Sequence, residues 1–198
     1  MIGTGLLNSM FLLGCSSLLL FSCSSSKTEE GKRIVRMAEE YIPLAVGNQW
    51  IYTYGLDANP TRQEVTVVGK KVIDGITWYQ IEYSFPVDGD ADTILLRNDR
   101  ERHIAYLVSM NQETILIDFG RSSLDSTSLE TAVVKETGKT VEAGGNTYSD
   151  CIVISSGFID AGVDTYAPGV GLVESWWFRG RKRLVGGRIA GKDIMQQK

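Results

Sequence analysis

The sequence predicts a mainly β fold: a curved antiparallel sheet, or a half-open or closed barrel, with one short helix in front of it. Three observations support this prediction. After residue 50, about eleven short runs rich in Val, Ile, Thr and aromatic residues are separated by turn-forming residues. Some runs alternate apolar and polar residues, as in residues 63–70, which is typical of strands with one solvated face. Only residues 32–41 place apolar side chains at helical spacing.

The chain starts with an uncharged, Leu-rich stretch, residues 2–22, that Ser and Gly interrupt. A spanning helix needs about 20 predominantly apolar residues, so this stretch fits the hydrophobic region of an export signal better. Residues 20–23 read Leu-Phe-Ser-Cys, which resembles the lipobox of bacterial lipoproteins. The resemblance implies a signal peptide over residues 1–22, cleavage before Cys23, and fatty acyl groups such as palmitate on Cys23. The polar residues 23–31 then predict a flexible tether.

Other interpretations of this start stay open. No Lys or Arg precedes the hydrophobic stretch and Phe21 is bulky, so an uncleaved anchor or an ordinary secretory peptide is the alternative. Cys15 is a rival lipidation site with a shorter hydrophobic run before it. Lipidation of Cys23 implies a membrane-anchored protein of the cell envelope. Because Ser24 and not Asp follows the cysteine, the outer membrane is favoured where the organism has two membranes.

Residues 32–198 are expected to form a single β-rich domain. With Cys15 removed and Cys23 lipidated, Cys151 is the remaining thiol, so an internal disulfide is not expected. Cys151 opens the apolar run Cys-Ile-Val-Ile and is predicted to be a small buried hydrophobe.

The first element of this domain is the short helix over residues 32–41, which Pro43 ends. Turns are predicted at residues 74–75 and 88–90. The predicted strands cover residues 50–54, 62–72, 77–85, 93–97, 104–109, 114–119, 131–136, 140–142, 151–155, 172–178 and 183–189.

The sequence contains no complete catalytic or metal-binding motif. The single histidine, His103, lies in a charged turn, and no Gly-x-Ser-x-Gly motif accompanies it. One histidine and one free cysteine cannot supply a zinc site of the usual spacing. Residues 88–99 resemble a calcium loop, but Thr93 replaces the required Gly, which favours an acidic hairpin tip. We therefore expect no enzyme activity, catalytic residue, metal or cofactor. The alternative is an envelope hydrolase that uses carboxylates such as Asp99, Glu101 or Glu174.

Aromatic residues suggest a binding site. Trp50, Tyr52 and Tyr54 alternate along the first predicted strand, and Trp176 and Phe178 do so along a late one. Inside a curved sheet, such residues can enclose an apolar ligand. The alternative is that these rings only fill the core.

Charge is unevenly distributed. Residues 179–198 hold seven basic residues and one acidic residue, whereas the whole chain has a net charge of −4. A basic end could contact anionic headgroups, or it could be a solvated terminal hairpin whose charges discourage edge pairing. Nucleic acid is not an expected partner.

Three segments together carry a family resemblance. Residues 41–52 read Tyr-Ile-Pro-Leu-Ala-Val-Gly-Asn-Gln-Trp-Ile-Tyr, residues 143–151 read Ala-Gly-Gly-Asn-Thr-Tyr-Ser-Asp-Cys, and residues 166–173 read Tyr-Ala-Pro-Gly-Val-Gly-Leu-Val. They resemble a group of bacterial envelope lipoproteins of unknown function. The resemblance implies a sheet loosely like the half-barrels of lipoprotein-sorting and lipid-carrier proteins, without enzyme activity. The resulting hypothesis is a membrane-anchored protein that binds an apolar or lipid-like ligand, or an interaction module for another envelope protein.

Overall fold

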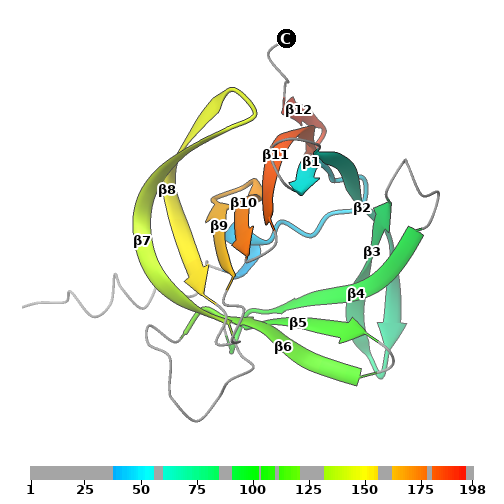
Figure 1. Cartoon of the computed structure of the whole chain (residues 1–198). Helices are drawn as coiled ribbons and strands as arrows, with labels where there is room; N and C mark the ends of the chain where they lie inside the picture. Colours follow the sequence, from blue (N-terminus) through cyan, green and yellow to red (C-terminus); the bar gives the residue numbers. More distant parts are fainter. Residues whose placement is uncertain are drawn as a thin grey trace, which may run out of the picture.

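The structure is a computed structural model that describes residues 38–55, 60–84, 91–102, 104–109, 112–120, 132–155, 162–177 and 180–194 (Figure 1). These residues form one helical turn at 38–41 and twelve strands. The strands are β1 (Gln49–Gly55), β2 (Thr61–Ile73), β3 (Ile76–Ser84), β4 (Ala91–Asp99), β5 (Ile104–Ser109), β6 (Gln112–Asp118), β7 (Ala132–Ala143), β8 (Asn146–Ser155), β9 (Val163–Ala167), β10 (Gly171–Trp177), β11 (Gly180–Ile189) and β12 (Lys192–Ile194).

Each strand pairs with the next one in the chain, and β1 also pairs with β11, so eleven strands close into a barrel. The short β12 adds to β11 outside this ring. Figure 1 looks along the ring, with β9, β10, β11 and β1 facing β4, β5 and β6. The prediction of a mainly β fold, a curved or closed barrel with one short helix, is confirmed.

One pairing departs from the antiparallel prediction. β6 and β7 run parallel, and only Ile117 with Ala132 and Asp118 with Val133 are matched there. All other adjacent strands are antiparallel. The pairing of β6 with β7 is therefore the shortest strand pairing in the ring.

The prediction of two strands over residues 131–136 and 140–142 was wrong. They belong to one long strand, β7, in which Gly138 has a φ of 77° and the register against β8 shifts three times. Positive φ and bulges bend a strand without ending it. Strands β9 and β12 were not predicted. Each is short, and an acidic residue, Asp164 in β9 and Asp193 in β12, interrupts its apolar pattern.

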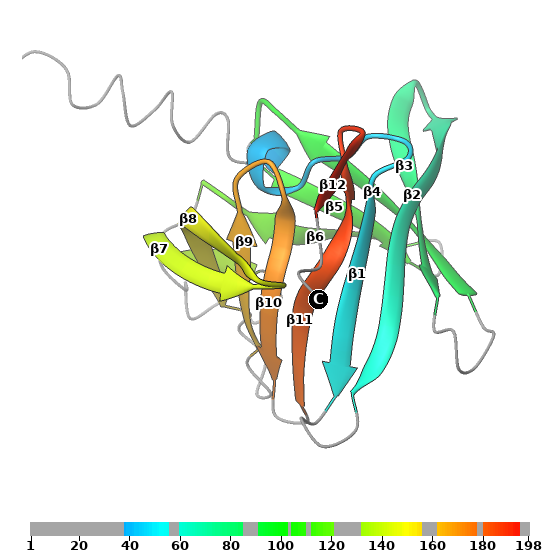
Figure 2. The same ribbon diagram turned by 90° about the horizontal axis from the view of Figure 1, so that it is seen from above.

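The helical turn seals one end of the barrel. Ala38, Tyr41 and Ile42 are buried against an apolar cluster that includes Ile117 and Ile152. The Tyr41 hydroxyl also donates a hydrogen bond to the Asp150 carbonyl (2.7 Å). Figure 2 shows this turn beside the loop that joins β9 to β10. The predicted helix is thus confirmed over residues 38–41, and its earlier part lies outside the described residues.

A turn at Gly47 precedes β1 and directs Trp50 into the core. Gly47 has a φ of 91°, which a residue with a side chain adopts at a cost. The buried Asn48 side chain donates to the Pro43 carbonyl (2.8 Å) and accepts from the Ala190 amide (2.9 Å). One amide side chain therefore ties the entry of β1 to the end of β11.

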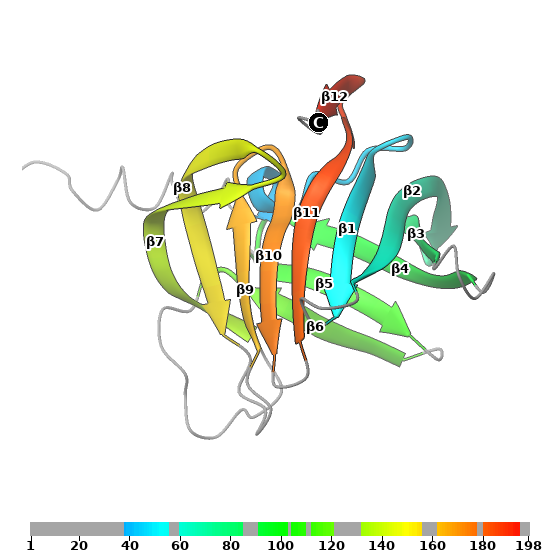
Figure 3. The same ribbon diagram turned by 45° about the horizontal axis from the view of Figure 1, so that its top comes forward.

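The hairpin of β7 and β8 extends beyond β9 and folds over the outer wall of the barrel. Figure 3 shows it crossing in front of β9 and β10, on the side away from β4, β5 and β6. At its tip, the Cα of Gly144 lies so close to the Leu184 and Val185 backbone that a Cβ would come within 3.1 Å of the Leu184 carbonyl oxygen. Cys151, in β8, is fully buried as predicted, and burial raises the pKa of its thiol.

Among the described residues, no helix has the length and apolar character needed to cross a membrane. The predicted signal peptide, the lipidation site Cys23 and the tether lie outside the described residues.

Candidate ligand-binding site inside the barrel

A row of polar side chains crosses the inner wall on three neighbouring strands. Asp164 of β9 stands opposite Ser175 of β10, and Ser175 stands opposite Lys182 of β11. Directly paired residues point to the same side of a sheet. The Lys182 ammonium lies 4.4 Å from the ring centroid of Tyr52, which is buried in the core. The row therefore faces the interior of the barrel.

Tyrosines surround this row. The Lys182 ammonium also lies 5.7 Å from the ring centroid of Tyr83 on β3. Tyr166 belongs to the same face of β9 as Asp164, two residues further along. The Tyr52 hydroxyl donates a hydrogen bond to the Leu172 carbonyl (3.0 Å), which fixes its ring beneath the ammonium.

Gln63 of β2 adds an amide to the inner wall. It stands opposite Tyr52 across the pair of β1 and β2, so both side chains point inward. Gln63 is 6% exposed, and its Oε1 has no hydrogen-bond partner among the described residues. A buried carbonyl oxygen without a donor is costly unless water or a ligand supplies one.

Part of the inner wall remains accessible. The apolar side chains of Tyr83, Ile94 and Leu107 pack against the core cluster but stay partly exposed. Their direct partners on neighbouring strands include Leu96 for Leu107 and Ile81 for Ile94, and both partners are buried. Ile94 and Leu107 are therefore less completely buried than these direct partners.

Burial shifts the pKa values of several residues in this cluster. Desolvation lowers the pKa of Lys182 to about 8, although the charge of Asp164 opposes the shift. Desolvation also raises the pKa of Asp164, against a hydrogen bond from Ser175 and the charge of Lys182. Burial raises the pKa of Tyr83 to about 12. The interior thus disfavours the charged forms of both Lys182 and Asp164.

The structure divides the five aromatic residues proposed from the sequence. Trp50 and Tyr52 are buried on the inner wall, and the Trp50 indole N–H donates to the Val170 carbonyl (2.5 Å). Tyr54 is 37% exposed at the rim. Phe178 lies outside the described residues.

The two tryptophans of β10 point to opposite walls. The Trp177 ring contacts Tyr54, with 5.0 Å between ring centroids, so Trp177 belongs to the inner side. Trp176 is 47% exposed on the outer wall, where the Arg181 guanidinium lies 4.1 Å from its ring centroid. Trp177, and not Trp176, therefore accompanies Tyr54.

Sequence reasoning missed the polar members of the inner wall, namely Gln63, Asp164, Ser175 and Lys182. A signal was present at Lys182. It lies between Arg181 and Arg183 in a strand, and strict alternation turns the middle residue of such a trio to the other face. The run of three basic residues was interpreted as surface instead.

Two of the carboxylates proposed for hydrolysis, Glu174 and Asp99, have separate ion-pair partners. Glu174 of β10 is buried on the outer wall and pairs with Arg181 and Arg183 of β11. Asp99 lies at the turn between β4 and β5, and Glu101 is exposed at the same turn. Glu174 and Asp99 therefore belong to different ion-pair clusters.

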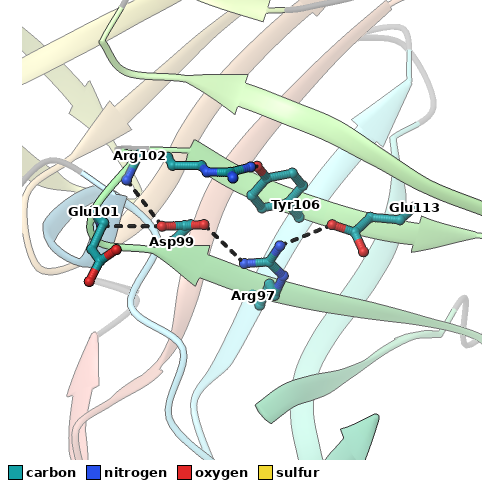
Figure 4. Close-up of polar contacts among 6 residues, drawn as sticks. All are labelled: Arg97, Asp99, Glu101, Arg102, Tyr106 and Glu113. Carbon is teal, nitrogen blue, oxygen red and sulfur yellow. Dashed lines mark hydrogen bonds and ion pairs between the residues drawn. The ribbon is translucent and has the colours of Figure 1, made fainter. Parts of the chain in front are cut away.

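The cluster around Asp99 has a structural role (Figure 4). Asp99 accepts hydrogen bonds from the Glu101 and Arg102 amides, and it pairs with Arg97 (3.4 Å). Arg97 also pairs with Glu113 (3.0 Å), which joins β4 to β6. Its guanidinium lies 3.9 Å from the ring centroid of Tyr106 and 5.0 Å from that of Trp78. These contacts hold the turn and the outer faces of four strands together.

Within residues 180–194, the described part of the basic C-terminal segment, the charges do not all lie on one surface. Arg181 and Arg183 pair with Glu174, Lys182 points inward, and Arg188 pairs with Asp193 (2.8 Å). Two open hollows flank Arg183 on the outer wall, with volumes of about 90 Å³ and 410 Å³. The larger is lined mainly by the tip of the hairpin, residues 142–147.

Among the described residues, no group of three or more His, Cys, Asp or Glu side chains could hold a metal ion. Asp92 lies in β4, whereas Asp88, Asp90 and His103 lie outside the described residues.

The fold is similar to two crystal structures. One is a protein from Bacteroides fragilis, inferred to be exported, with a YmcC-like fold: the TM-score is 0.52 at 12% identity, covering 75% of this chain and 99% of the other. The second is a protein from Parabacteroides distasonis, inferred to be a lipoprotein: the TM-score is 0.51 at 12% identity, covering 75% and 98%. Neither description names an enzyme activity. No protein-family model and no curated protein matches the chain. At this identity the likeness concerns the fold, and the fold of this chain is YmcC-like.

Proposed function

We propose that the protein is a non-catalytic lipoprotein of the bacterial cell envelope that binds an apolar, lipid-like ligand inside its barrel. The observation that carries the binding proposal is the inner wall, where the inward side chains Tyr83, Ile94 and Leu107 are only partly buried and Tyr83 lies near the Lys182 ammonium. Binding sites for small ligands are mostly apolar and concave, with a few polar groups that orient the ligand. The inner wall has this composition.

The anchoring part of the proposal rests on two kinds of support. The sequence Leu-Phe-Ser-Cys ends an uncharged hydrophobic segment, and acylation of Cys23 would give stable membrane attachment through more than one chain. The similar crystal structures belong to proteins inferred to be exported or lipid-anchored. Ser24 favours the outer membrane as the destination where two membranes exist.

Native mass spectrometry of the full chain, purified from the membrane of its own host, tests both parts. We expect a mass increase from covalent acyl groups that the Cys23→Ser variant lacks. We also expect a non-covalent lipid-like adduct that survives gentle ionisation. A wild-type protein with an uncleaved, unacylated N-terminus would contradict the anchor, and an adduct-free protein that takes up no apolar probe would contradict the binding site.

The two adjacent tryptophans provide a matched control for the binding site. Trp177→Ala removes a ring from the inner side, and Trp176→Ala removes one from the outer wall. Loss of the adduct is expected in the first variant and retention in the second, with thermal melting to confirm that both are folded. Equal adduct in all three proteins would place the ligand elsewhere.

A second candidate is an interaction module for another envelope protein. It is favoured by Trp176, a large aromatic side chain that stays 47% exposed beneath Arg181. Trp and Arg are the residue types enriched where protein interfaces bind most strongly. Photo-crosslinking from position 176 in intact cells tests this role. A specific protein adduct that Arg181→Ala weakens would support it, and labelling by lipid alone would contradict it.

A further inference from the structure

We infer that the ligand of the proposed site is an amphipathic anion, whose carboxylate or phosphate group is held by Lys182 while its chain lies against the tyrosine rings. This inference rests on the proposed function and names the ligand class. It assigns Lys182 as the head-group contact and Gln63 as a second polar contact.

The first argument concerns the ammonium of Lys182. It lies over two aromatic faces, 4.4 Å from the ring centroid of Tyr52 and 5.7 Å from that of Tyr83, and among the described residues no carboxylate forms an ion pair with it within 4.0 Å. Aromatic faces stabilise a cation only in part. A half-buried ammonium without a counter-ion is costly, so the site favours a ligand that supplies one.

The second argument concerns Asp164, the carboxyl that could have served as the counter-ion. Ser175 lies between Asp164 and Lys182 in the row, and its hydroxyl acts to lower the pKa of Asp164 against the effect of burial. Strand β10 lies between the strands that carry the carboxyl and the amine, and the two groups form no ion pair within 4.0 Å. The amine is thereby left free to contact a ligand on the inner side of the sheet.

Gln63 provides an independent indication of a polar ligand. Its Oε1 is buried, points to the same interior as Tyr52, and has no donor among the described residues. A hydroxyl or N–H of the ligand would satisfy this oxygen. The inner wall thus offers an ammonium for an anionic oxygen and an amide oxygen for a donor, one on each side of Tyr52.

The apolar part of the ligand has matching surface. Tyr83, Ile94 and Leu107 come from three successive strands of the wall and are only partly buried. A single alkyl chain can lie across them, with about 0.8 kcal/mol gained for each buried CH₂ group. A free fatty acid anion and a lipid phosphate share this head-and-chain chemistry.

The test uses three probes with the same chain and different head groups: decanoate, decanol and decylammonium. Calorimetric titration of the full-length Cys23→Ser protein is expected to show decanoate binding about tenfold more tightly than decanol, and decylammonium binding most weakly. Decyl phosphate in a further titration distinguishes a phosphate head group from a carboxylate.

Substitutions then assign the contact. Lys182→Met is expected to reduce the preference for decanoate over decanol to less than about twofold, while Arg181→Met on the outer wall keeps it. Asp164→Asn is expected to tighten decanoate binding, because it removes a like charge next to the head group. If Lys182→Met does not fold, Lys182→Gln and the wild-type probe series still decide the question.

The possible failures are distinguishable. Equal or tighter binding of decanol than of decanoate would overturn the anion inference and leave the apolar site intact. Failure of all three probes to bind would overturn the proposed function itself. A decanoate preference that survives in both Lys182 variants would assign the head group to another residue and overturn the inference for Lys182.

Discussion

The indole N–H of Trp50 donates a hydrogen bond to the carbonyl of Val170, which joins β1 to the turn before β10. Gly171 lies directly beneath this indole, and the amide of Gly169 bonds to the Glu40 carbonyl (2.7 Å). Two of the segments that carry the family resemblance, residues 41–52 and 166–173, are therefore one structural unit. Trp50, Val170 and Gly171 fix the fold at this end of the barrel, whereas Tyr52, from the first of the two segments, also contacts Lys182 in the proposed site.

This unit predicts a difference between two glycines. Gly171 has a φ of 99°, and a Cβ there would lie 3.2 Å from the Trp50 indole nitrogen. Gly169 has a φ of 70° with open space around it. Gly169→Val should cost about 1–3 kcal/mol from backbone strain, and Gly171→Val should cost clearly more because it also displaces Trp50. Urea denaturation of both variants measures this, and equal costs would show that the indole contact is unimportant.

Closure of the barrel depends on Gly187. It stands opposite Trp50 with a φ of 153°, and a Cβ at this position would overlap the Gln49 carbonyl oxygen. Gly187→Ala is expected to lower the free energy of unfolding by at least about 2 kcal/mol more than Gly138→Ala. Gly138 also has positive φ, but its surroundings are open. Denaturation midpoints decide the comparison, and a tolerated Gly187→Ala would mean that β1 and β11 separate easily.

The lowered pKa of Asp99 predicts that the folded protein loses stability in acid. Burial raises the pKa of Asp99, but hydrogen bonds from the Arg102 amide and Arg97 outweigh this effect and leave the pKa below 3.8. A carboxyl with a lowered pKa in the folded state stabilises the protein above its ordinary pKa, and that contribution is lost as the pH falls. Asp99→Asn should therefore flatten the loss of stability below about pH 4. Glu142→Gln, at an exposed hairpin position, serves as the control and should leave the acid profile unchanged.

The lowered pKa of Lys182 predicts a change in stability at alkaline pH. Its pKa falls from 10.5 to about 8 in the folded protein because of burial. The unfolded chain then binds more protons between these values, so stability rises with pH across this window. The wild type should gain on the order of 2 kcal/mol relative to Lys182→Met between about pH 8 and 10.5. Urea denaturation of both proteins at several pH values measures the difference in the free energy of unfolding. If this difference does not change with pH, Lys182 is solvated in the folded protein.

Local patterns in the sequence were sufficient for much of the fold. Turn residues such as Asp74 and Gly75, which have φ of 50° and 78°, marked a hairpin correctly, and the apolar run after Cys151 indicated its burial. The joining of residues 131–136 with 140–142 was not accessible in this way. A bulged strand keeps pairing through Gly138, and only the partner strand β8 shows that the strand continues.

The candidate site was predictable in part for a similar reason. The inward position of Trp50 and Tyr52 follows from alternation within one strand. The row of Asp164, Ser175 and Lys182 depends on the register among three strands, two of which are joined by a bulged hairpin. Register is set by tertiary pairing, so the row could not be derived from any single segment.

The bond between the Asn48 side chain and the Ala190 amide spans 142 positions of the chain and lies beside the seam that closes the ring. Because the ring closes through β1 and β11, the barrel can complete its folding only late. Until β11 has emerged from the ribosome or from a translocation channel, β1 has an unpaired edge and the ring stays open. Long-range pairing of this kind slows folding, and unpaired edges invite association with other chains. We therefore expect the newly made chain to stay unfolded until almost all of it is available, and to need protection from aggregation during that interval.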